Sequence, residues 1–521
     1  MSESCHFRAS FWHCSVAHIG ESEDWVRRGT GQSPRESDAR ISGLCSPCGG
    51  MFVPLVLARR LTARAGLAVG LLGDGAGHPA QVSRCGRRSR LLWVALAGSG
   101  LAALLWAGER RKAAAAPPSV TGRRRSLAAV DPLAVCVDGS PSAYYWRKGD
   151  PGSSTWIVDL QGGEGVDWCH CEATCRQRCA PGTTSSLCSS RAWPEEFELG
   201  PGLLNPALHS ALSGANRAWV PYCTSDAHMG DAAAFGMQFR GARVLQAVLA
   251  DLVQLGLGSE SGRPLVILGG QSAGGRGAMV SLEYVRDMLG PELAQRVDVV
   301  GFLDSPLWVD VPPYSAQFVG FAAMCQGVFS YANVTRLGRR CEAAHPGSDR
   351  WKCIMGEYRM PHIRTPYLLV ASQYDAFQLG QNTISLPKDA NETAYADSLA
   401  NRTRDLMSTL RAGWQPGGLQ NAVFSWTCHD HASSCSSRGF DRRTCGPDRV
   451  TLDAATLQFL GLEPLTGYPR TLEWIDSCSG INCGDGCGIG LERHQRLRPR
   501  PPASRAGQAL LADPAGPGAS S

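Results

Sequence analysis

The residues best suited to chemistry stand in PLVILGGQSAGGRGAM, residues 264–279. The apolar run 265–268 predicts a strand, and the residues after the glycines predict a helix. Between them, Gly270-Gln271-Ser272-Ala273-Gly274 fits G-x-S-x-G, in which the glycines permit a sharp turn that lifts the serine above a sheet edge. Ser272 is therefore the candidate nucleophile. An ordinary glycine-rich turn is the alternative, and a phosphate loop is set aside because no Gly-Lys-Ser/Thr follows.

A serine hydroxyl is too weakly acidic to attack an ester unaided. It needs a base within hydrogen-bond reach and a carboxylate that orients this base. In hydrolases built on such a turn the chain order is Ser, then Asp or Glu, then His. Asp304 and Asp375 each follow a predicted strand. We favour Asp375, which follows the later strand, and expect Asp304 to serve the nearby backbone or the substrate; a capping role is the alternative for either.

Histidines after the nucleophile are the candidates for the base: His345, His362, His429, His431 and His494. Cys428-His429-Asp430-His431 follows the last apolar strand directly, where a loop histidine can reach back over the sheet edge. His494 lies in a polar tail and His345 in a Pro-Gly turn. Spacing leaves His429 and His431 as alternatives, and a structural surface histidine is the competing interpretation of each.

Ester hydrolysis also needs hydrogen-bond donors for the negative charge that develops on the carbonyl oxygen. One should be the amide of Ala273, directly after the nucleophile, and the others amides of a glycine-rich loop after an early strand. Leu160-Gln161-Gly162-Gly163-Glu164 follows an apolar run and supplies such a loop. A plain turn is the alternative interpretation of these glycines.

Several other elements must position these residues. Residues 239–255, FRGARVLQAVLADLVQL, have apolar side chains at helical spacing and predict a helix before the strand of the nucleophile. Further predicted elements are strands at 155–160, 218–221, 299–303, 367–371 and 422–426, a hairpin at 138–147, and helices at 406–410 and 451–460. Strands that alternate with helices, with polar residues just past the strand ends, predict an α/β fold. Its mostly parallel sheet should be flanked by helices, with the site at the carboxyl edge.

The cysteines indicate the compartment. Of 21 cysteines, five precede residue 90, and 16 remain from Cys136 onward. A large even set predicts disulfides and an oxidising compartment. The cluster at 169–179 offers zinc-ligand types, but its spacing matches no standard zinc pattern, so disulfides are favoured. Three glycosylation sequons agree with a secretory route: Asn333, Asn391 and Asn401.

The ends of the chain differ from its middle. Residues 1–90 are basic and aperiodic, and we interpret them as a disordered cytosolic or targeting extension, with Met51 as an alternative start. Residues 91–107 form a stretch of 17 without a charge, which predicts a transmembrane signal anchor or a cleaved signal peptide. The remainder is expected to divide into a linker at 108–128, a folded domain at 129–491 and a disordered tail at 492–521.

The formal net charge of the 521 residues is +5, and much of the basic excess lies in the two ends. The middle of the chain shows no interleaving of basic and aromatic residues, which argues against nucleic-acid binding. We expect no nucleic-acid partner, membrane contact only through residues 91–107, and a monomeric chain.

Segments in chain order resemble the pectin acetylesterase family: LQGGEGVDWC, LNPALHSALSGANRAWVPYCTSD, FRGARVLQAVLADLVQLGL, LGGQSAGGRGAM, LDSP and SQYDAFQL. The resemblance covers about residues 138–437. The family includes the plant pectin acetylesterases and the animal palmitoleoyl-protein carboxylesterase Notum. It implies an α/β-hydrolase fold, hydrolysis of carboxylic esters in the secretory pathway or outside the cell, and no metal or cofactor.

The resemblance also implies roles by position. The family's serine falls on Ser272, its aspartate on Asp375 in Q-Y-D-x-x-Q-L, and its histidine, three residues after a cysteine, on His431. Its oxyanion amides fall near Gly163, Glu164 and Ala273. This chain departs from the family at residues 164–169, beside the expected acyl pocket.

The expected function is that of a serine carboxylesterase that removes acyl groups, acetyl first, from an O-acylated polysaccharide. The alternatives are a Notum-like deacylase of a lipid-modified protein and a catalytically inactive cell-surface binding glycoprotein. A complete set of serine, histidine and aspartate argues against the inactive protein.

Overall fold

The computed structural model describes residues 120–488, except 164–167, 181–186, 201, 206–209, 384–385, 413–420, 437–438, 441–442 and 463–471. All described residues belong to one compact unit that includes Ala116–Ser521. The expected extension, the expected membrane segment at 91–107 and the expected tail lie outside the described residues. Among the helices that the structure describes, none is both long and apolar enough to span a bilayer.

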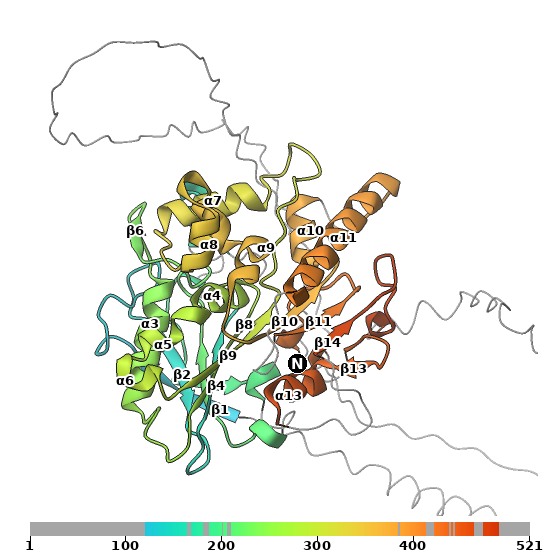
Figure 1. Ribbon diagram of the computed structural model, residues 1–521. Coiled ribbons are helices and arrows are strands. Elements are labelled where there is room, and N and C mark those ends of the chain that lie inside the picture. Colours follow the sequence, from blue (N-terminus) through green and yellow to red (C-terminus); the bar gives the residue numbers. More distant parts are fainter. Residues whose placement is uncertain are drawn as a thin grey trace, which may run out of the picture. The chain divides into compact units, whose positions relative to one another are not determined.

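The strands of the main sheet, in chain order, are β1 (Val120–Ser126), β2 (Ala143–Arg147), β3 (Thr155–Leu160), β4 (Glu196–Leu199), β5 (Asn216–Val220), β8 (Leu265–Gln271), β9 (Asp298–Asp304), β10 (Tyr367–Ser372), β11 (Ala422–Trp426) and β14 (Glu473–Ile475). Their spatial order in this ten-stranded sheet is β14-β11-β10-β9-β8-β3-β5-β2-β1-β4 (Figure 1). Pairing is parallel from β14 to β5 and antiparallel from β5 to β4. Two small hairpins pair β6 (Ala232–Ala234) with β7 (Met237–Phe239) and β12 (Thr444–Cys445) with β13 (Val450–Thr451).

The described α-helices are α2 (Glu172–Arg178), α3 (Gly241–Gln254), α4 (Ala273–Ser281), α5 (Val285–Met288), α6 (Pro291–Ala294), α7 (Phe321–Tyr331), α8 (Arg339–Ala344), α9 (Gly356–Arg359), α10 (Ala376–Asn382), α11 (Ala390–Ala412) and α13 (Leu452–Leu460). Short 3-10 helices are η2 (Gly202–Leu204), η3 (Ser210–Leu212), η4 (Leu282–Tyr284), η5 (Gly347–Ile354), η6 (Met360–His362), η7 (Ser433–Cys435) and η8 (Asp485–Gly488).

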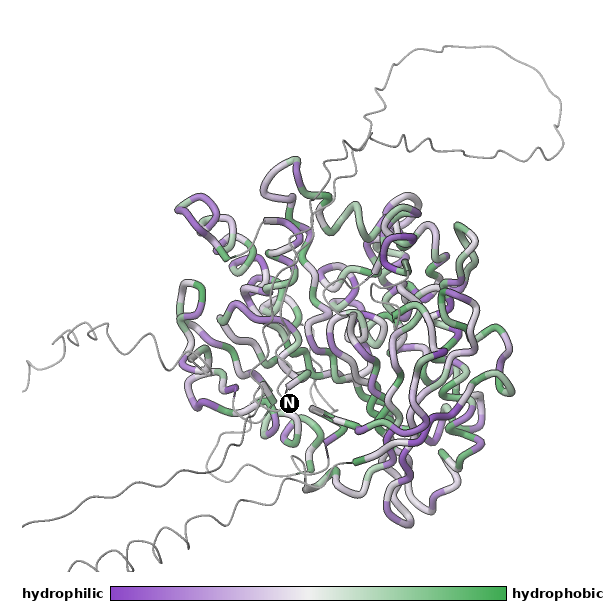
Figure 2. Tube along the Cα trace, turned by 180° about the vertical axis from the view of Figure 1, so that it is seen from behind, coloured by the Kyte–Doolittle hydropathy of each residue, from purple (hydrophilic) through white to green (hydrophobic). Residues whose placement is uncertain are grey.

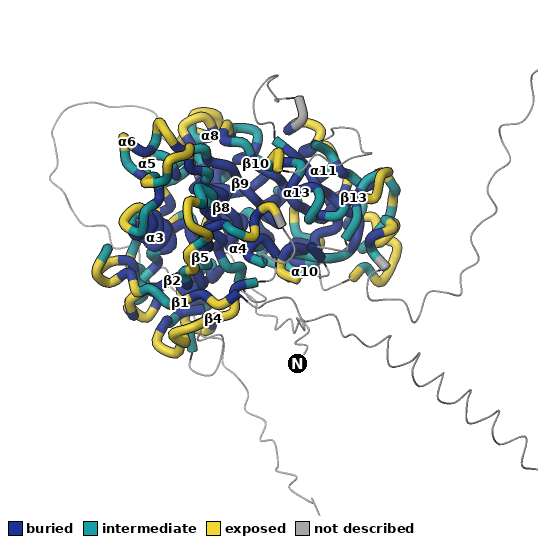
Figure 3. The backbone as a smooth tube through the Cα atoms, turned by 90° about the horizontal axis from the view of Figure 1, so that it is seen from below, coloured by how far each residue is buried: buried dark blue, intermediate teal, exposed yellow. Residues whose placement is uncertain are grey.

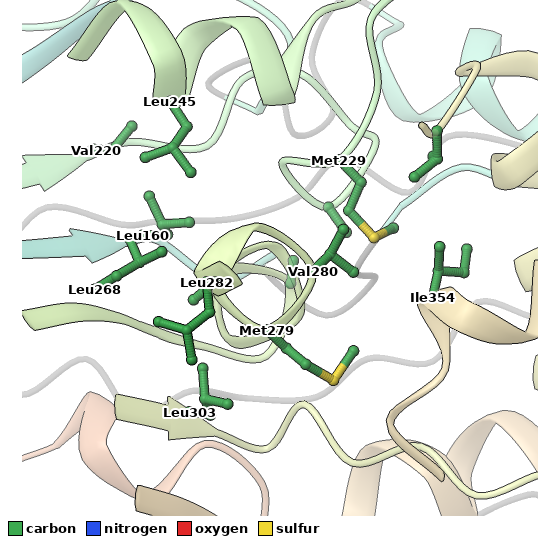
Figure 4. Packing of buried hydrophobic residues seen from close by; sticks show 14 of the residues in the cluster. Leu160, Val220, Met229, Leu245, Leu268, Met279, Val280, Leu282, Leu303 and Ile354 are labelled. Carbon is green, nitrogen blue, oxygen red and sulfur yellow. The ribbon is translucent and has the colours of Figure 1, made fainter. Parts of the chain in front are cut away.

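Helices cover both faces of the sheet, because alternate side chains of a strand point to opposite faces. In β3, Trp156 and Val158 join the buried cluster that includes α3, α4 and α7, whereas Ile157 joins the cluster that includes α13. Figure 4 shows Leu245 of α3 close to Val220 of β5 within the first cluster. Figure 3 shows β8, β9 and β10 as buried elements, and Figure 2 shows apolar and polar residues intermixed along the same trace.

The predicted central elements are present close to their predicted bounds. The strand predictions at 155–160 and 422–426 match β3 and β11, and the helix predicted over 239–255 contains α3. The predicted fold class, an α/β fold with a mostly parallel sheet flanked by helices, is confirmed. The short helix predicted at 406–410 is part of the longer α11.

The start of the folded part differs from the prediction. Residues 108–128 are predicted as a linker, but Val120–Ser126 forms β1 and pairs with β2 and β4. The physical reason is charge compensation from distant parts of the chain. Arg125 donates two hydrogen bonds to the buried Asp251 of α3, at 2.7 and 2.8 Å. The basic run that suggested a solvated linker is therefore the outer part of the sheet.

Disulfides are confirmed as a feature of the folded part. Six form among the described residues: Cys136–Cys223, Cys169–Cys175, Cys179–Cys188, Cys341–Cys353, Cys428–Cys487 and Cys478–Cys483. The cluster at 169–179 is thus divided between two disulfides, and only Cys171 of its cysteines is a free thiol. The asparagines of the three sequons are all exposed.

Candidate active site

The candidate nucleophile lies at a strained turn between β8 and α4. Ser272 has φ 56° and ψ −121°, a backbone conformation that costs free energy for any residue with a Cβ. The turn passes so close to β3 that a Cβ at Gly274 would overlap the carbonyl oxygen of Leu160. Glycine is therefore required there, and the serine is held at the carboxyl edge of the sheet.

The structure brings the three predicted triad residues together from three separate loops. Ser272 Oγ lies 2.7 Å from His431 Nε2, and His431 Nδ1 lies 2.7 Å from Asp375 Oδ2. A carboxylate accepts hydrogen bonds, so Nδ1 carries the imidazole proton and Nε2 is free to accept from the serine hydroxyl. Ser272 and Asp375 are 5% and 6% exposed, which shields both bonds from water.

The triad carboxylate is fixed by its own helix. Asp375 is the N-cap of α10, and its Oδ1 accepts a hydrogen bond from the amide of Gln378 at 2.8 Å. The other oxygen remains directed at His431. Phe377 stacks on the His431 ring with centroids 5.1 Å apart, so α10 holds both the acid and one face of the imidazole.

Asp304 does not join this arrangement and instead anchors the loop that carries His431. Its Oδ2 accepts hydrogen bonds from the amide and hydroxyl of Ser434, at 2.7 and 2.6 Å. Ser305 accepts from the amide of Ala432 at 3.0 Å. Burial raises the pKa of Asp304, while the hydrogen bonds from Ser434 oppose that rise. The carboxyl end of β9 thus positions the histidine loop, as expected for a residue that serves the backbone.

None of the other described candidate histidines is hydrogen-bonded to Ser272 or Asp375. His429 is oriented through its backbone amide, which donates to Asn482 Oδ1 at 2.8 Å, and burial lowers the pKa of its ring. His345 and His362 lie beside Cys341, a grouping with metal-ligand atom types. Cys341 is bonded to Cys353, so its sulfur cannot serve as a thiolate ligand. His494 lies outside the described residues.

The structure describes two of the three residues expected to supply oxyanion donors, Gly163 and Ala273. Ala273 is the first residue of α4, and no described residue accepts a hydrogen bond from its amide. Gly162 packs against the elbow so closely that a Cβ there would lie 2.8 Å from the Gln271 carbonyl oxygen. The loop that ends at Gly163 therefore lies over the nucleophile, whereas Glu164 lies outside the described residues. The positive end of α4 adds a field that favours an oxyanion here.

One residue of this site had no signal in the sequence. His228 Nε2 lies 3.0 Å from the carbonyl oxygen of Gln161, so it must donate the hydrogen bond that fixes the loop. Burial lowers the pKa of His228 to about 4, which keeps the ring neutral at physiological pH. The ring also packs against Tyr222, with centroids 4.7 Å apart. Only the fold brings this loop histidine beside Gln161.

Buried aromatic rings fill the space on the α4 and α10 side of the triad. Trp308 lies 4.6 Å from Trp168 and 5.1 Å from Phe321, centroid to centroid, and Phe377 continues the cluster to His431. The Arg276 guanidinium, one turn after Ser272, lies over the Trp168 and Trp308 rings. All five side chains are at most 2% exposed, so this side is closed.

A serine on a strained strand-to-helix turn, hydrogen-bonded through histidine to aspartate on a parallel sheet, defines the arrangement of an α/β serine hydrolase. A family model described as pectinacetylesterase matches residues 126–445. The chain belongs to the pectinacetylesterase family, and the resemblance seen in its motifs is confirmed.

Curated relatives and solved structures agree with this family. The palmitoleoyl-protein carboxylesterase Notum of Drosophila melanogaster is 30% identical over 300 residues, which are 55% of this chain and 43% of that protein. Human Notum is 27% identical over 369 residues, 68% of this chain and 70% of that protein. A crystal structure of the Drosophila Wnt deacylase Notum superposes with a TM-score of 0.59 at 27% identity, covering 71% of this chain and 99% of that one. The α/β-hydrolase fold and the class of carboxylic ester hydrolase are thereby confirmed.

Proposed function

We propose that this chain is an exported serine carboxylesterase that removes acetyl groups from an O-acylated polysaccharide. The observation that carries the proposal is the continuous hydrogen-bonded path from Ser272 Oγ through His431 to Asp375, with both bonds at 2.7 Å. An inactive binding glycoprotein would not need to preserve a strained serine and two aligned hydrogen bonds.

The mechanism follows from these positions. Ser272 Oγ attacks the ester carbonyl carbon while His431 Nε2 takes its proton, and Asp375 stabilises the resulting imidazolium. The carbonyl oxygen becomes an oxyanion held by the Ala273 amide and by amides near Gly163 and Glu164. Collapse breaks the bond to the alcohol, which leaves with the proton from His431. Water, deprotonated by His431, then attacks the acyl-enzyme and releases the carboxylic acid with a restored serine.

A short acyl group is supported by the packing beside the oxyanion loop. Trp168, which follows that loop after the undescribed residues 164–167, is fully buried against Trp308. Rings at native packing density leave no room for a long chain between them. An acetyl group needs only the space directly beside Ser272.

A lipid-modified protein is the second candidate substrate, and the relatives favour it. Both relatives compared above are named palmitoleoyl-protein carboxylesterases. A fatty acyl chain would require the aromatic cluster on the α4 side to open. The choice between acetyl and fatty acyl groups therefore rests on whether that cluster is rigid.

Export is supported by the disulfides and the exposed sequon asparagines, because disulfides persist in oxidising compartments. We place the catalytic unit in the lumen or outside the cell, as a monomer. Residues 91–107 would act as its signal anchor or cleaved signal peptide.

The direct test is turnover of p-nitrophenyl acetate by the purified domain and by Ser272→Ala. The variant should lose roughly 10⁶-fold in kcat, as removal of a serine nucleophile does in other hydrolases. A matched control is Ser408→Ala, which removes a hydroxyl on α11 far along the chain and should leave turnover unchanged. Absence of activity in the unaltered domain between pH 5 and pH 9, or equal activity in Ser272→Ala, would contradict the proposed function.

A further inference from the structure

Two cavities adjoin one another on the opposite side of the catalytic edge from the aromatic cluster. The first, of about 200 Å³, lies between Asp159, Gln271 and Ser434. The second, of about 180 Å³, continues past Tyr145 and Trp193. Gln161, Phe197 and Trp219 line both cavities, so the two form one groove. We call it the β4 groove, because Phe197 belongs to β4.

One wall of the β4 groove is a stacked aromatic pair. The rings of Phe197 and Trp219 are 4.5 Å apart and 15° from parallel. Tyr145 supports both rings at centroid distances of 5.2 and 5.7 Å. Phe197 remains 37% exposed although it is a large hydrophobic residue. A rigid, partly exposed aromatic face offers apolar contact at low entropy cost and suits a flat ligand with C–H groups.

The rest of the groove carries hydrogen-bonding groups that other described residues leave unused. The Asp159 carboxylate is 8% exposed and has no hydrogen-bond partner within the described part of the chain. Gln161 accepts from the amide of Tyr222 at 2.9 Å, which leaves its NH₂ group for another partner. Gln271 also has an amide side chain without a described partner. Asp159 is buried and the two glutamines are half-buried, so these groups are open to a polar ligand or to the water that precedes it.

The β4 groove is lined by residues that adjoin the candidate catalytic residues in the chain. Gln271 directly precedes Ser272, and Gln161 begins the oxyanion loop. Ser434 lies three residues after His431 in the loop that Asp304 anchors. A ligand in the groove is therefore bordered by the turn that carries Ser272, by the oxyanion loop and by the loop that carries His431.

We propose that the β4 groove binds an uncharged sugar ring, the one that carries the ester or its neighbour in an O-acylated glycan. This inference rests on the proposed function and names the glycan class. The stacked Phe197 and Trp219 would contact the C–H face of the ring, while Asp159 and the two glutamines would bond its hydroxyls. Among the described residues that line the two cavities there is no lysine or arginine, so nothing there would pair with the carboxylate of a uronic acid or with a sulfate group.

The binding test uses Ser272→Ala, which cannot turn the ligand over. Its affinity is measured by calorimetry for an O-acetylated xylo-oligosaccharide and for an O-acetylated oligogalacturonide of equal length. We expect the neutral oligosaccharide to bind about ten-fold more tightly, because a uronic acid would bring its carboxylate into the groove without a cationic partner. Equal or tighter binding of the oligogalacturonide would overturn the proposal.

Phe197→Ala, introduced into the Ser272→Ala chain, should weaken binding of the xylo-oligosaccharide about ten-fold. Tyr314→Ala is the matched control, because Tyr314 is equally exposed, at 39%, and also packs on another ring, that of Tyr395. It should leave the affinity unchanged. Equal affinities of the Phe197→Ala and Tyr314→Ala chains would overturn the proposal.

A kinetic test separates the groove from the triad. In the active chain, Phe197→Ala should lower kcat/KM for the acetylated xylo-oligosaccharide about ten-fold more than for p-nitrophenyl acetate, through KM. An unchanged ratio of the two substrates would contradict the groove. If the unaltered chain hydrolyses neither ester but Ser272→Ala still binds the xylo-oligosaccharide through Phe197, the proposed function fails and the groove stands.

Discussion

The two sides of the catalytic edge are built differently. On the α4 and α10 side, Trp308, Phe377 and their neighbours leave almost no exposed surface beside His431. On the other side, Asp159 and Gln271 line a cavity of about 200 Å³. An ester has two halves, and under the proposed function the closed side would receive the acyl group. Under that function, the difference between the two sides would make selection of the acyl group and recognition of the alcohol separate tasks.

The triad lies between the two sides, so a change there should affect every substrate alike. Asp375→Asn keeps the size of the side chain but removes the charge that orients and stabilises His431. We expect kcat to fall roughly 10⁴-fold for acetyl and octanoyl p-nitrophenyl esters in the same proportion. Steady-state kinetics with both esters checks this. Unequal losses would mean that Asp375 also shapes the acyl side.

The closed side can be opened by Trp308→Ala. Loss of this fully buried ring should reduce the free energy of unfolding by about 3–5 kcal/mol, measured by chemical denaturation. The space left beside Phe377 should also raise the ratio of octanoyl to acetyl turnover roughly ten-fold.

The control for this change is Trp474→Ala in β14, where the ring is also buried, at 2% exposure. It should cost a similar amount of stability with no change in the ratio of octanoyl to acetyl turnover. A ratio that moves equally in both variants would show that general loosening, rather than the aromatic cluster, sets the acyl length.

On the open side, Asp159 should make the stability of the fold depend on pH. Burial, together with the neighbouring Asp304, raises the pKa of Asp159 to about 7. The folded state then holds a proton that the unfolded chain loses near pH 4, so Asp159 destabilises the fold increasingly between pH 4 and pH 7. Asp159→Asn removes this penalty, which is on the order of 4 kcal/mol at most. The variant should therefore show a smaller fall in Tm than the unaltered chain from pH 4.5 to pH 7.5.

Asp251 is a buried aspartate whose pKa is shifted in the opposite direction. Burial alone would raise the pKa of Asp251, but hydrogen bonds from Arg125 and Tyr144 lower it. Its carboxylate stabilises the fold above its unfolded pKa, and this contribution is lost as the pH falls. Asp251→Asn should thus lower Tm most at neutral pH. If Tm changed with pH in the same direction in Asp159→Asn and Asp251→Asn, the view that Asp159 lacks a hydrogen-bond partner would be contradicted.

The catalytic elements were predictable from the sequence because their signals are local. An apolar strand, a glycine-flanked serine and a helix are neighbours in the chain, so backbone sterics alone dictate the elbow at Ser272. Asp375 was predicted because it follows a strand end. Between His429 and His431 local spacing could not decide, and the resemblance to the family selected the residue that lies at the serine.

Other features depend on partners that are distant in the chain. The basic strand β1 is part of the sheet because Arg125 meets Asp251, 126 residues later. His228 and Asp304 gain their positioning roles only when β5, β9 and the histidine loop converge. The sequence by itself determined the sheet and the candidate nucleophile, since these follow from short-range periodicity and turn chemistry, and its ordered motifs showed the family by resemblance. The tertiary structure alone decided which side of the edge is filled and which is open, because packing and burial join residues that no local pattern connects.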